Sequence, residues 1–591
     1  MKKKLALLFA VIITIVMVAC ANETESPADP PTDDSGQEQA VAPTDEAGQD
    51  DAVPDVEPAT LSLFFQGPIS GAPHPVGVQN DLVIERLRED TGATIDFFPT
   101  NTDEVLLTLL AGGELPDLTF ISDLRHIPAV IQGGLAYRLD DLIDELGPDI
   151  LANAPRKIDL ARRLFSNDTG YLYGILGMAG PEGTPQNYVF GPQIRWDLYE
   201  QLGHPNIESY MDLLPLLQDM LELEPVNDDG RINYGISFNT DWDSTIPLQI
   251  MLMPAPMYGI QLENAWHAEV DNANGFAVSS MFTEDSWTMR GAEFIFEANQ
   301  MGLVDPESMT QTWDTVSDKL LTGRMMFQSV NWPVGGFNHS MQEQGRDYRG
   351  FVPFFPNDAT LLWCWVDELN GTDGMWVISS DTNHPELAMS VLNWLNSVEG
   401  SMAIYSGFEG IHWEMIDGEP VRPDEIELLF RGDEDWNEAQ GVGKYWNMAG
   451  LTRGFPIPGT DGIGLSHALW PSTHRPSEIN PIPEFLQNFL DFYGVYRPSQ
   501  AYDLQKERVV VADRYGPLME TPPDHIAQII SRISAMANTE FYRMMFASDR
   551  AEFEAIRASI IQQAYDLGYQ EQFDWIVEAR ERARLIWEES N

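Results

Sequence analysis

Thr60-Leu-Ser-Leu-Phe-Phe65 is the first of three short apolar runs that predict β-strands; the others are Thr94-Ile-Asp-Phe-Phe98 and Leu118-Thr-Phe-Ile121. Between them lie two stretches with helical spacing of apolar residues, and Asp103 is placed to begin the second. Strand, helix, strand, helix and strand with short joints predict a βαβαβ unit. Such a unit closes right-handed into a parallel sheet.

Ligands of open α/β sheets bind beyond the carboxyl ends of the strands. In this chain those ends are Gln66-Gly67-Pro68, Pro99-Thr100-Asn101 and Ser122-Asp123. Gln66 and Asn101 are therefore candidate ligand-binding residues.

Further along the chain, Met375-Trp-Val-Ile378 predicts a strand and Pro385 to Leu395 a helix. Residues 500–591 are expected to be largely amphipathic helix.

The N-terminus has the pattern of a secretory signal: three lysines, the apolar run Leu5 to Val18, then Val18-Ala19-Cys20. A cysteine directly after a small residue looks like a lipoprotein signal peptide. Residues 1–19 would then be removed and Cys20 lipidated; an uncut N-terminal membrane anchor is the alternative. Residues 21–58 hold twelve acids and no base, so we expect 20–58 to be a disordered, lipid-anchored tether.

The composition excludes general binding to nucleic acid. With 34 basic and 92 acidic side chains, the formal net charge is −58, whereas phosphate backbones need clustered Lys and Arg. Hydrophobic residues make up 43% of the chain, enough for a buried core. A protein adapted to brine or alkaline medium and an ordinary acidic secreted protein both fit this surface.

Signatures of enzymes are absent from the sequence. There is no G-x-S-x-G, H-E-x-x-H, phosphate-binding loop or G-x-G-x-x-G, and the ten histidines are scattered. His412 is interpreted as structural. We expect no catalytic site and no metal cofactor.

Aromatic residues give a more specific indication. Sugar rings have apolar C–H faces and a rim of hydroxyls, so a sugar site needs flat aromatic side chains beside carboxylates and amides. Four predicted loops have this composition, and they supply the further candidate binding residues Asp241, Trp242, Trp332, Trp365, Asp367 and Trp446. Core packing is the competing interpretation, since Trp is highly buried on average.

Several segments resemble the extracellular solute-binding lipoproteins of ABC importers, of the large sugar-binding type found in Gram-positive bacteria. The segments are Leu109-Leu-Ala-Gly-Gly-Glu-Leu-Pro-Asp117, Gly134 to Ile143, Arg195-Trp-Asp-Leu-Tyr-Glu-Gln-Leu-Gly203, Gly374 to Leu395 and Phe408-Glu-Gly-Ile-His-Trp413. Their order and spacing carry the resemblance, which covers nearly the whole chain after the signal.

The resemblance implies an α/β, two-lobe, periplasmic-binding-protein-like fold of type II. Each lobe would be a parallel-type sheet flanked by helices, with a ligand cleft between the lobes. The expected ranges are 59–185 for the first part of lobe 1, 186–325 for the first part of lobe 2, 326–380 for the return to lobe 1, and 381–591 for the completion of lobe 2 with the C-terminal helices.

The loop Glu224 to Asn233 is a candidate calcium site, because some alginate-binding relatives hold calcium with a loop in this region. Here Val226 and Ile232 stand where oxygen ligands would be wanted, and the closing residue is Asn233. Calcium takes six to eight oxygens. A capped turn is the favoured interpretation, and calcium stays open.

The leading hypothesis is a lipid-anchored receptor on the outer face of the cytoplasmic membrane. It would be a monomer that captures an oligosaccharide and delivers it to an ABC transporter permease. The alternatives are a receptor for a peptide or other solute, a surface carbohydrate-active enzyme such as a lyase or hydrolase, and a sensor subunit.

Overall fold

A computed structural model describes most of the chain beyond the N-terminal segment. The described residues are 57–70, 73–180, 190–241, 246–263, 266–359, 361–363, 373–460, 463–466, 468, 481–495, 507–509, 513 and 515–589.

The first sheet contains the predicted βαβαβ unit, which is confirmed. Its elements are β1 (Ala59–Phe65), α1 (Leu82–Thr91), β3 (Ala93–Phe97), α2 (Asp103–Gly112) and β4 (Leu118–Ile121). Both β3 and β4 pair with β1 in parallel. The side chain of Asp81 caps α1, and Gly92 ends it with a left-handed φ of 83°.

The whole first sheet is mixed rather than parallel. Its order is β2-β3-β1-β4-β13-β5, with β2 (Gly77–Val78), β5 (Ile175–Leu176) and β13 (Met375–Ile378) at its flanks. β13 pairs antiparallel with β4 and with β5. The chain therefore returns to this sheet after about 200 residues, and the predicted strand at 375–378 is confirmed.

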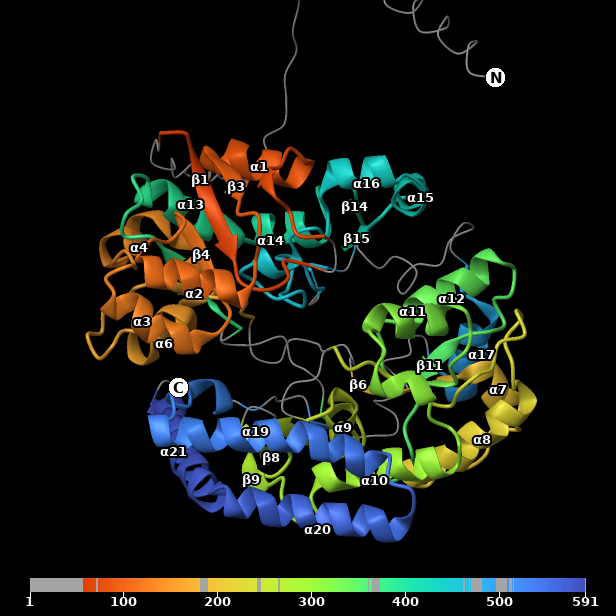
Figure 1. The fold of residues 1–591 in the computed structure, drawn as a ribbon. Helices are drawn as coiled ribbons and strands as arrows, with labels where there is room; N and C mark the ends of the chain where they lie inside the picture. The colour runs from red at the N-terminus through yellow and green to blue at the C-terminus, as the bar shows by residue number, and fades with distance from the viewer. Residues whose placement is uncertain are drawn as a thin grey trace, which may run out of the picture. The chain divides into compact units, whose positions relative to one another are not determined.

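Helices cover the first sheet (Figure 1), and α13 packs against α1, α4 and α5. The expected helix from Pro385 to Leu395 is α13 itself. The helices of this part are α3 (Ile127–Gln132), α4 (Asp140–Leu146), α5 (Pro148–Asn153), α6 (Pro155–Leu164), α13 (Pro385–Leu395), α14 (Val398–Tyr405), α15 (Asp424–Gly432) and α16 (Glu434–Gln440), with the hairpin β14 (Glu414–Ile416) and β15 (Glu419–Val421) before α15.

The second large core is built around a sheet of order β10-β6-β11. β6 (Phe190–Arg195) lies between β10 (Phe327–Val330) and β11 (Phe351–Pro353), and both pairings are antiparallel. This differs from the parallel-type sheet expected for the second lobe. The two partners of β6 follow it by more than 130 residues, so local sequence pattern carries no signal for their direction.

Most of the second core is helical. Its helices are α7 (Trp196–Gln201), α8 (Leu213–Leu223), α9 (Leu248–Leu252), α10 (Trp287–Gln300), α11 (Trp313–Leu321), α12 (Val334–Glu343), α17 (Glu484–Tyr493), α19 (Asp524–Met545), α20 (Arg550–Asp566) and α21 (Tyr569–Glu589). Long helices α19, α20 and α21, blue in Figure 1, pack on one another and supply the expected C-terminal helical region.

Two small sheets complete the strands: β7 (Ile260–Glu263), β8 (Ala268–Asp271) and β9 (Ala277–Ser280), and the pair β12 (Leu361–Trp363) with β16 (Glu507–Val509). Among the described residues, no helix has the length and hydrophobicity needed to cross a membrane.

The two large hydrophobic cores divide the chain differently from the expected ranges. Side chains of 61–176 and 375–468 build most of the first core, whereas those of 194–359 and 485–569 build the second. The expected return segment 326–380 thus contributes to both cores, because β10 and β11 pair with β6 while β13 pairs with β4. Much of 381–468, expected in lobe 2, packs in the first core.

Candidate functional site

Gln66 organises the carboxyl edge of the first sheet. The residue follows β1 and is 2% exposed. Its Nε2 donates to Asp103 Oδ1 at 2.8 Å, and its Oε1 accepts from the backbone N–H of Asp123 at 3.2 Å. One amide therefore ties the loop after β1 to the start of α2 and to the loop after β4.

Asn101 and a distant segment complete this edge. Asn101 Nδ2 donates to the carbonyl oxygen of Gly67 at 2.8 Å, and the Asn101 carbonyl accepts from the Gly67 N–H at 2.9 Å. Asn447 donates through Nδ2 to the Pro68 carbonyl and through its backbone N–H to the Ile69 carbonyl, both at 2.8 Å.

Trp446 comes next to Asn447, so the fold brings it to the same edge as Gln66 and Asn101. The indole is half-buried; it meets the ring of Tyr405 edge-on at 5.4 Å, and the Arg453 guanidinium lies 5.4 Å from the indole centroid. The edge thus combines two amides that are engaged in hydrogen bonds within the chain, an aromatic ring and a cation. The aromatic ring can stack on a polyhydroxylated ligand.

A second polar cluster lies where β10 ends in the second core. The side chains of Gln193 on β6, Gln249 on α9, and Gln328 and Ser329 on β10 are all buried. Ser329 Oγ donates to Gln249 Oε1 at 3.3 Å, and the Ser329 N–H donates to Gln328 Oε1 at 2.8 Å. Among the described residues, Gln249 Nε2 is buried without a hydrogen-bond partner.

Trp332 follows this cluster by three residues and is 48% exposed. An aromatic side chain this open, three residues after buried amides in the sequence, has the composition of a ring-stacking site. The register of β10 against β6 shifts between Gln328 and Val330, which redirects the chain just before Trp332.

Comparison with models of protein families and with curated protein sequences gives no match for this chain. Solved structures do match. An ABC-transporter substrate-binding protein of Streptococcus pneumoniae, FusA in complex with kestose, has a TM-score of 0.61 at 17% identity, covering 90% of this chain and 100% of its own. The alginate-binding protein AlgQ2 without calcium ion has a TM-score of 0.59 at 14% identity, covering 89% and 98%.

A third match is an HMO-binding, ABC-transporter-associated solute-binding protein of Bifidobacterium longum infantis. Its TM-score is 0.57 at 14% identity, covering 89% of this chain and 99% of its own. The chain has the fold of the ABC-transporter solute-binding proteins. The expected two-domain α/β fold class is thereby confirmed.

Within this solute-binding-protein fold, Asp241 has a structural contact. Its carboxylate accepts from Asn239 Nδ2 at 2.7 Å and from the backbone N–H of Trp313 at 3.1 Å, at the first turn of α11. The side chain is exposed, so its proposed contact with ligand stays a prediction. The candidate residues Trp242, Trp365, Asp367 and Cys20 lie outside the described residues.

The buried glutamines were not among the candidates chosen from the sequence. Gln193 and Gln328 stand in strands whose neighbouring residues are buried, and a polar residue within a short, largely apolar segment is the local signal that could have indicated them. Gln249 has no such signal, because only the contact of α9 with β10 places it there.

His412 has the surroundings of a structural residue. It is fully buried; Nδ1 accepts from the Phe408 N–H at 3.0 Å, and Nε2 lies 3.2 Å from Gln440 Oε1. Nδ1 as acceptor requires the neutral tautomer with hydrogen on Nε2. Burial lowers the pKa of His412 to about 4, which keeps the ring neutral.

Among the described residues, no group of three or more His, Cys, Asp or Glu side chains is arranged to hold a metal ion.

Proposed function

We propose that the chain is the receptor subunit of an ABC importer, which binds an oligosaccharide in a cleft between two lobes and delivers it to the permease. The carrying observation is the fold shared over about nine-tenths of the chain with transporter-associated proteins, one of them named in complex with kestose and another for binding alginate. The two polar and aromatic clusters support a sugar as the ligand.

Each cluster would supply one wall of the site. One wall would contain the residues at the carboxyl edge of the first sheet, which are Gln66, Asn101 and Trp446. Asp241 and Trp332 would contribute from the second core, together with Trp242, Trp365 and Asp367. Gln249 Nε2, a buried donor without a partner among the described residues, adds a group able to bind a sugar hydroxyl.

The membrane attachment is proposed on the sequence alone. Lipidation of Cys20 would hold the protein on the outer face of the cytoplasmic membrane, and the acidic tether 20–58 would separate the folded body from the lipid. We propose that it works as a monomer with the permease subunits as its partners, without enzymatic activity of its own.

The experiment uses protein purified from its host, examined by native mass spectrometry for a bound molecule. Calorimetry against neutral and acidic oligosaccharides then measures affinity, and chromatography of the recovered sugar tests whether it is altered. A glycan bound and recovered intact is the expected result. A bound peptide favours the peptide receptor, and a shortened sugar favours the enzyme; either outcome contradicts the proposal. Sugar uptake that persists without the receptor gene would indicate a sensor instead.

A further inference from the structure

The loop Glu224 to Asn233 is the candidate calcium site from the sequence, for which a capped turn is the favoured interpretation. The names of two structural neighbours mention such a site: AlgQ2 without calcium ion, and a FusA EF-hand mutant, which has a TM-score of 0.60 at 16% identity, covering 90% of this chain and 100% of its own. The fold thus makes calcium a candidate ligand, and the contacts of the loop test whether its oxygens fit.

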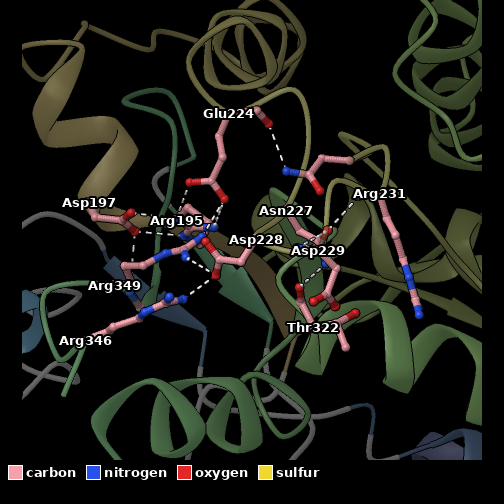
Figure 2. A network of polar contacts seen from close by, with 12 residues as sticks. Arg195, Asp197, Glu224, Asn227, Asp228, Asp229, Arg231, Thr322, Arg346 and Arg349 are labelled. Atoms are coloured by element: carbon pink, nitrogen blue, oxygen red, sulfur yellow. Dashed lines mark hydrogen bonds and ion pairs between the residues drawn. The ribbon is translucent and has the colours of Figure 1, made fainter. Parts of the chain in front are cut away.

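Two loop carboxylates face arginines (Figure 2). Glu224 Oε1 accepts from Arg195 Nη1 at 3.3 Å and from Arg349 Nη2 at 2.5 Å, and its Oε2 accepts from Arg195 Nη2 at 3.2 Å. Asp228 Oδ2 accepts from Arg349 Nη1 at 3.1 Å and from Arg346 Nη1. Arg195 also binds Asp197 through two hydrogen bonds.

The charges of this cluster are balanced, and Arg195, Asp197 and Arg349 are withdrawn from water whereas Asp228 and Arg346 are open to it. Three guanidinium groups face the carboxylates of Asp197, Glu224 and Asp228, and the side chains of Arg195 and Arg349 are 0% and 7% exposed. Partial burial raises the pKa of Asp228, but hydrogen bonds and charge from Arg346 and Arg349 outweigh it and hold the pKa below its ordinary value. A divalent ion would add two uncompensated positive charges to this cluster, which is costly beside the buried guanidinium groups of Arg195 and Arg349.

The amide oxygens of the loop are unsuited to a cation as well. Asn227 Oδ1 accepts from the backbone N–H groups of Asp229 and Arg231 at 3.2 and 2.9 Å. Val226 and Ile232 have hydrocarbon side chains, which offer no oxygen, and they pair with each other as an isolated bridge. Asn233 Oδ1 is buried without a hydrogen-bond partner among the described residues, and the exposed Asp229 adds one further loop carboxylate, so these side chains fall short of the six oxygens that calcium needs.

We propose that Arg195, Arg346 and Arg349 neutralise this loop in place of a metal ion, so that its fold is independent of calcium. The proposal is separate from the sugar-binding function, because these residues are not among the proposed ligand contacts.

The first test compares melting temperatures after treatment with EDTA and after addition of CaCl2. Calcium at about 5 mM exceeds the dissociation constants of weak extracellular modules, about 10⁻⁴–10⁻³ M. No shift is expected for the wild type. A rise with calcium that disappears in Asp228→Asn would overturn the proposal. A rise that persists in Asp228→Asn places the ion elsewhere and leaves the loop calcium-free, as proposed.

The second test substitutes the arginines. Arg349→Gln is expected to lower the melting temperature by several degrees, because it leaves Glu224 and Asp228 short of one cation each. Arg584→Gln is the matched control: Arg584 also binds two carboxylates, Glu581 and Glu588, but on the exposed surface of α21. If Arg349→Gln fails to fold, the melting temperature of Arg346→Gln is compared with that of Arg584→Gln instead, since Arg346 is 37% exposed. A loss no larger than that of the control would overturn the proposal.

Discussion

The hydroxyl of Tyr445 donates a hydrogen bond of 2.5 Å to Asp81 Oδ2, across 364 positions of sequence. Asp81 also accepts the Ile84 N–H through Oδ1 at 3.2 Å, which caps α1, and binds Lys444 Nζ at 3.1 Å. The buried carboxylate of Asp81 therefore caps the start of α1 and also holds Tyr445, the residue before Trp446. Burial and the charge of Asp81 both raise the pKa of Tyr445, so its hydroxyl remains a donor.

Tyr445→Phe is expected to lower the free energy of unfolding by about 1–3 kcal/mol, since a buried hydrogen bond to a charged group is lost. If Trp446 contacts the sugar, affinity should fall as well, because its chain neighbour is no longer held. Urea denaturation and calorimetry measure the two effects. Tyr348→Phe is the control, since Tyr348 is 48% exposed, and it should change neither. Equal stability of the two variants would refute the role given to the Asp81 contact.

Trp332→Ala is expected to weaken oligosaccharide binding by about 5- to 150-fold, or about 1–3 kcal/mol, while the melting temperature stays nearly constant. The exposed position of Trp332 is the reason. Trp196→Ala is the contrasting variant: Trp196 is 0% exposed and packs on Phe489 at 5.1 Å. It should lose about 3–5 kcal/mol of stability. If Trp332→Ala loses stability and keeps its affinity for the oligosaccharide, Trp332 is a core residue and the prediction is wrong.

Stability should fall as the pH drops below 6.5. Burial lowers the pKa of His267 and of His412 to about 4, from the ordinary histidine value of 6.5. Between these values the unfolded chain binds protons that the folded chain does not, so each histidine costs about 1.4 kcal/mol per pH unit on acidification. Above pH 6.5 both histidines are neutral in the folded and the unfolded chain, so they cost no free energy of unfolding there.

Denaturation of His412→Asn at pH 7, 6 and 5 tests this dependence. The variant should have a shallower loss of unfolding free energy with falling pH than the wild type. His525→Asn serves as the control, because that side chain is 63% exposed. Parallel pH profiles for the wild type and His412→Asn would contradict the prediction.

Cys20→Ser is expected to abolish lipid labelling and to release the protein into the medium or leave an uncleaved precursor. The reason is the Val18-Ala19-Cys20 junction after a short apolar run. Radioactive palmitate and cell fractionation measure the effect. Unchanged labelling of the variant would exclude lipidation at Cys20.

Local physics determined the elements that the sequence could predict. β4 and α13 have the bounds expected from their apolar patterns, and β1 differs from its prediction by one residue. The strands of the βαβαβ unit are short apolar runs, and its helices end in glycine caps, so hydrogen bonds and burial within a few residues define them. Gln66 and Asn101 could be chosen as candidates because strand ends in such a unit meet at one edge.

Contacts between distant segments were decided only by the tertiary structure. The antiparallel insertion of β13 beside β4, the buried cluster of Gln193, Gln249 and Gln328, and the meeting of Arg349 with Glu224 across 125 positions have no local pattern. Each depends on which faces bury together when the whole chain packs, since buried charges and amides must find partners wherever the fold brings them. The sequence therefore specified the building units and the composition of the proposed sugar site, while long-range packing selected the residues that lie together.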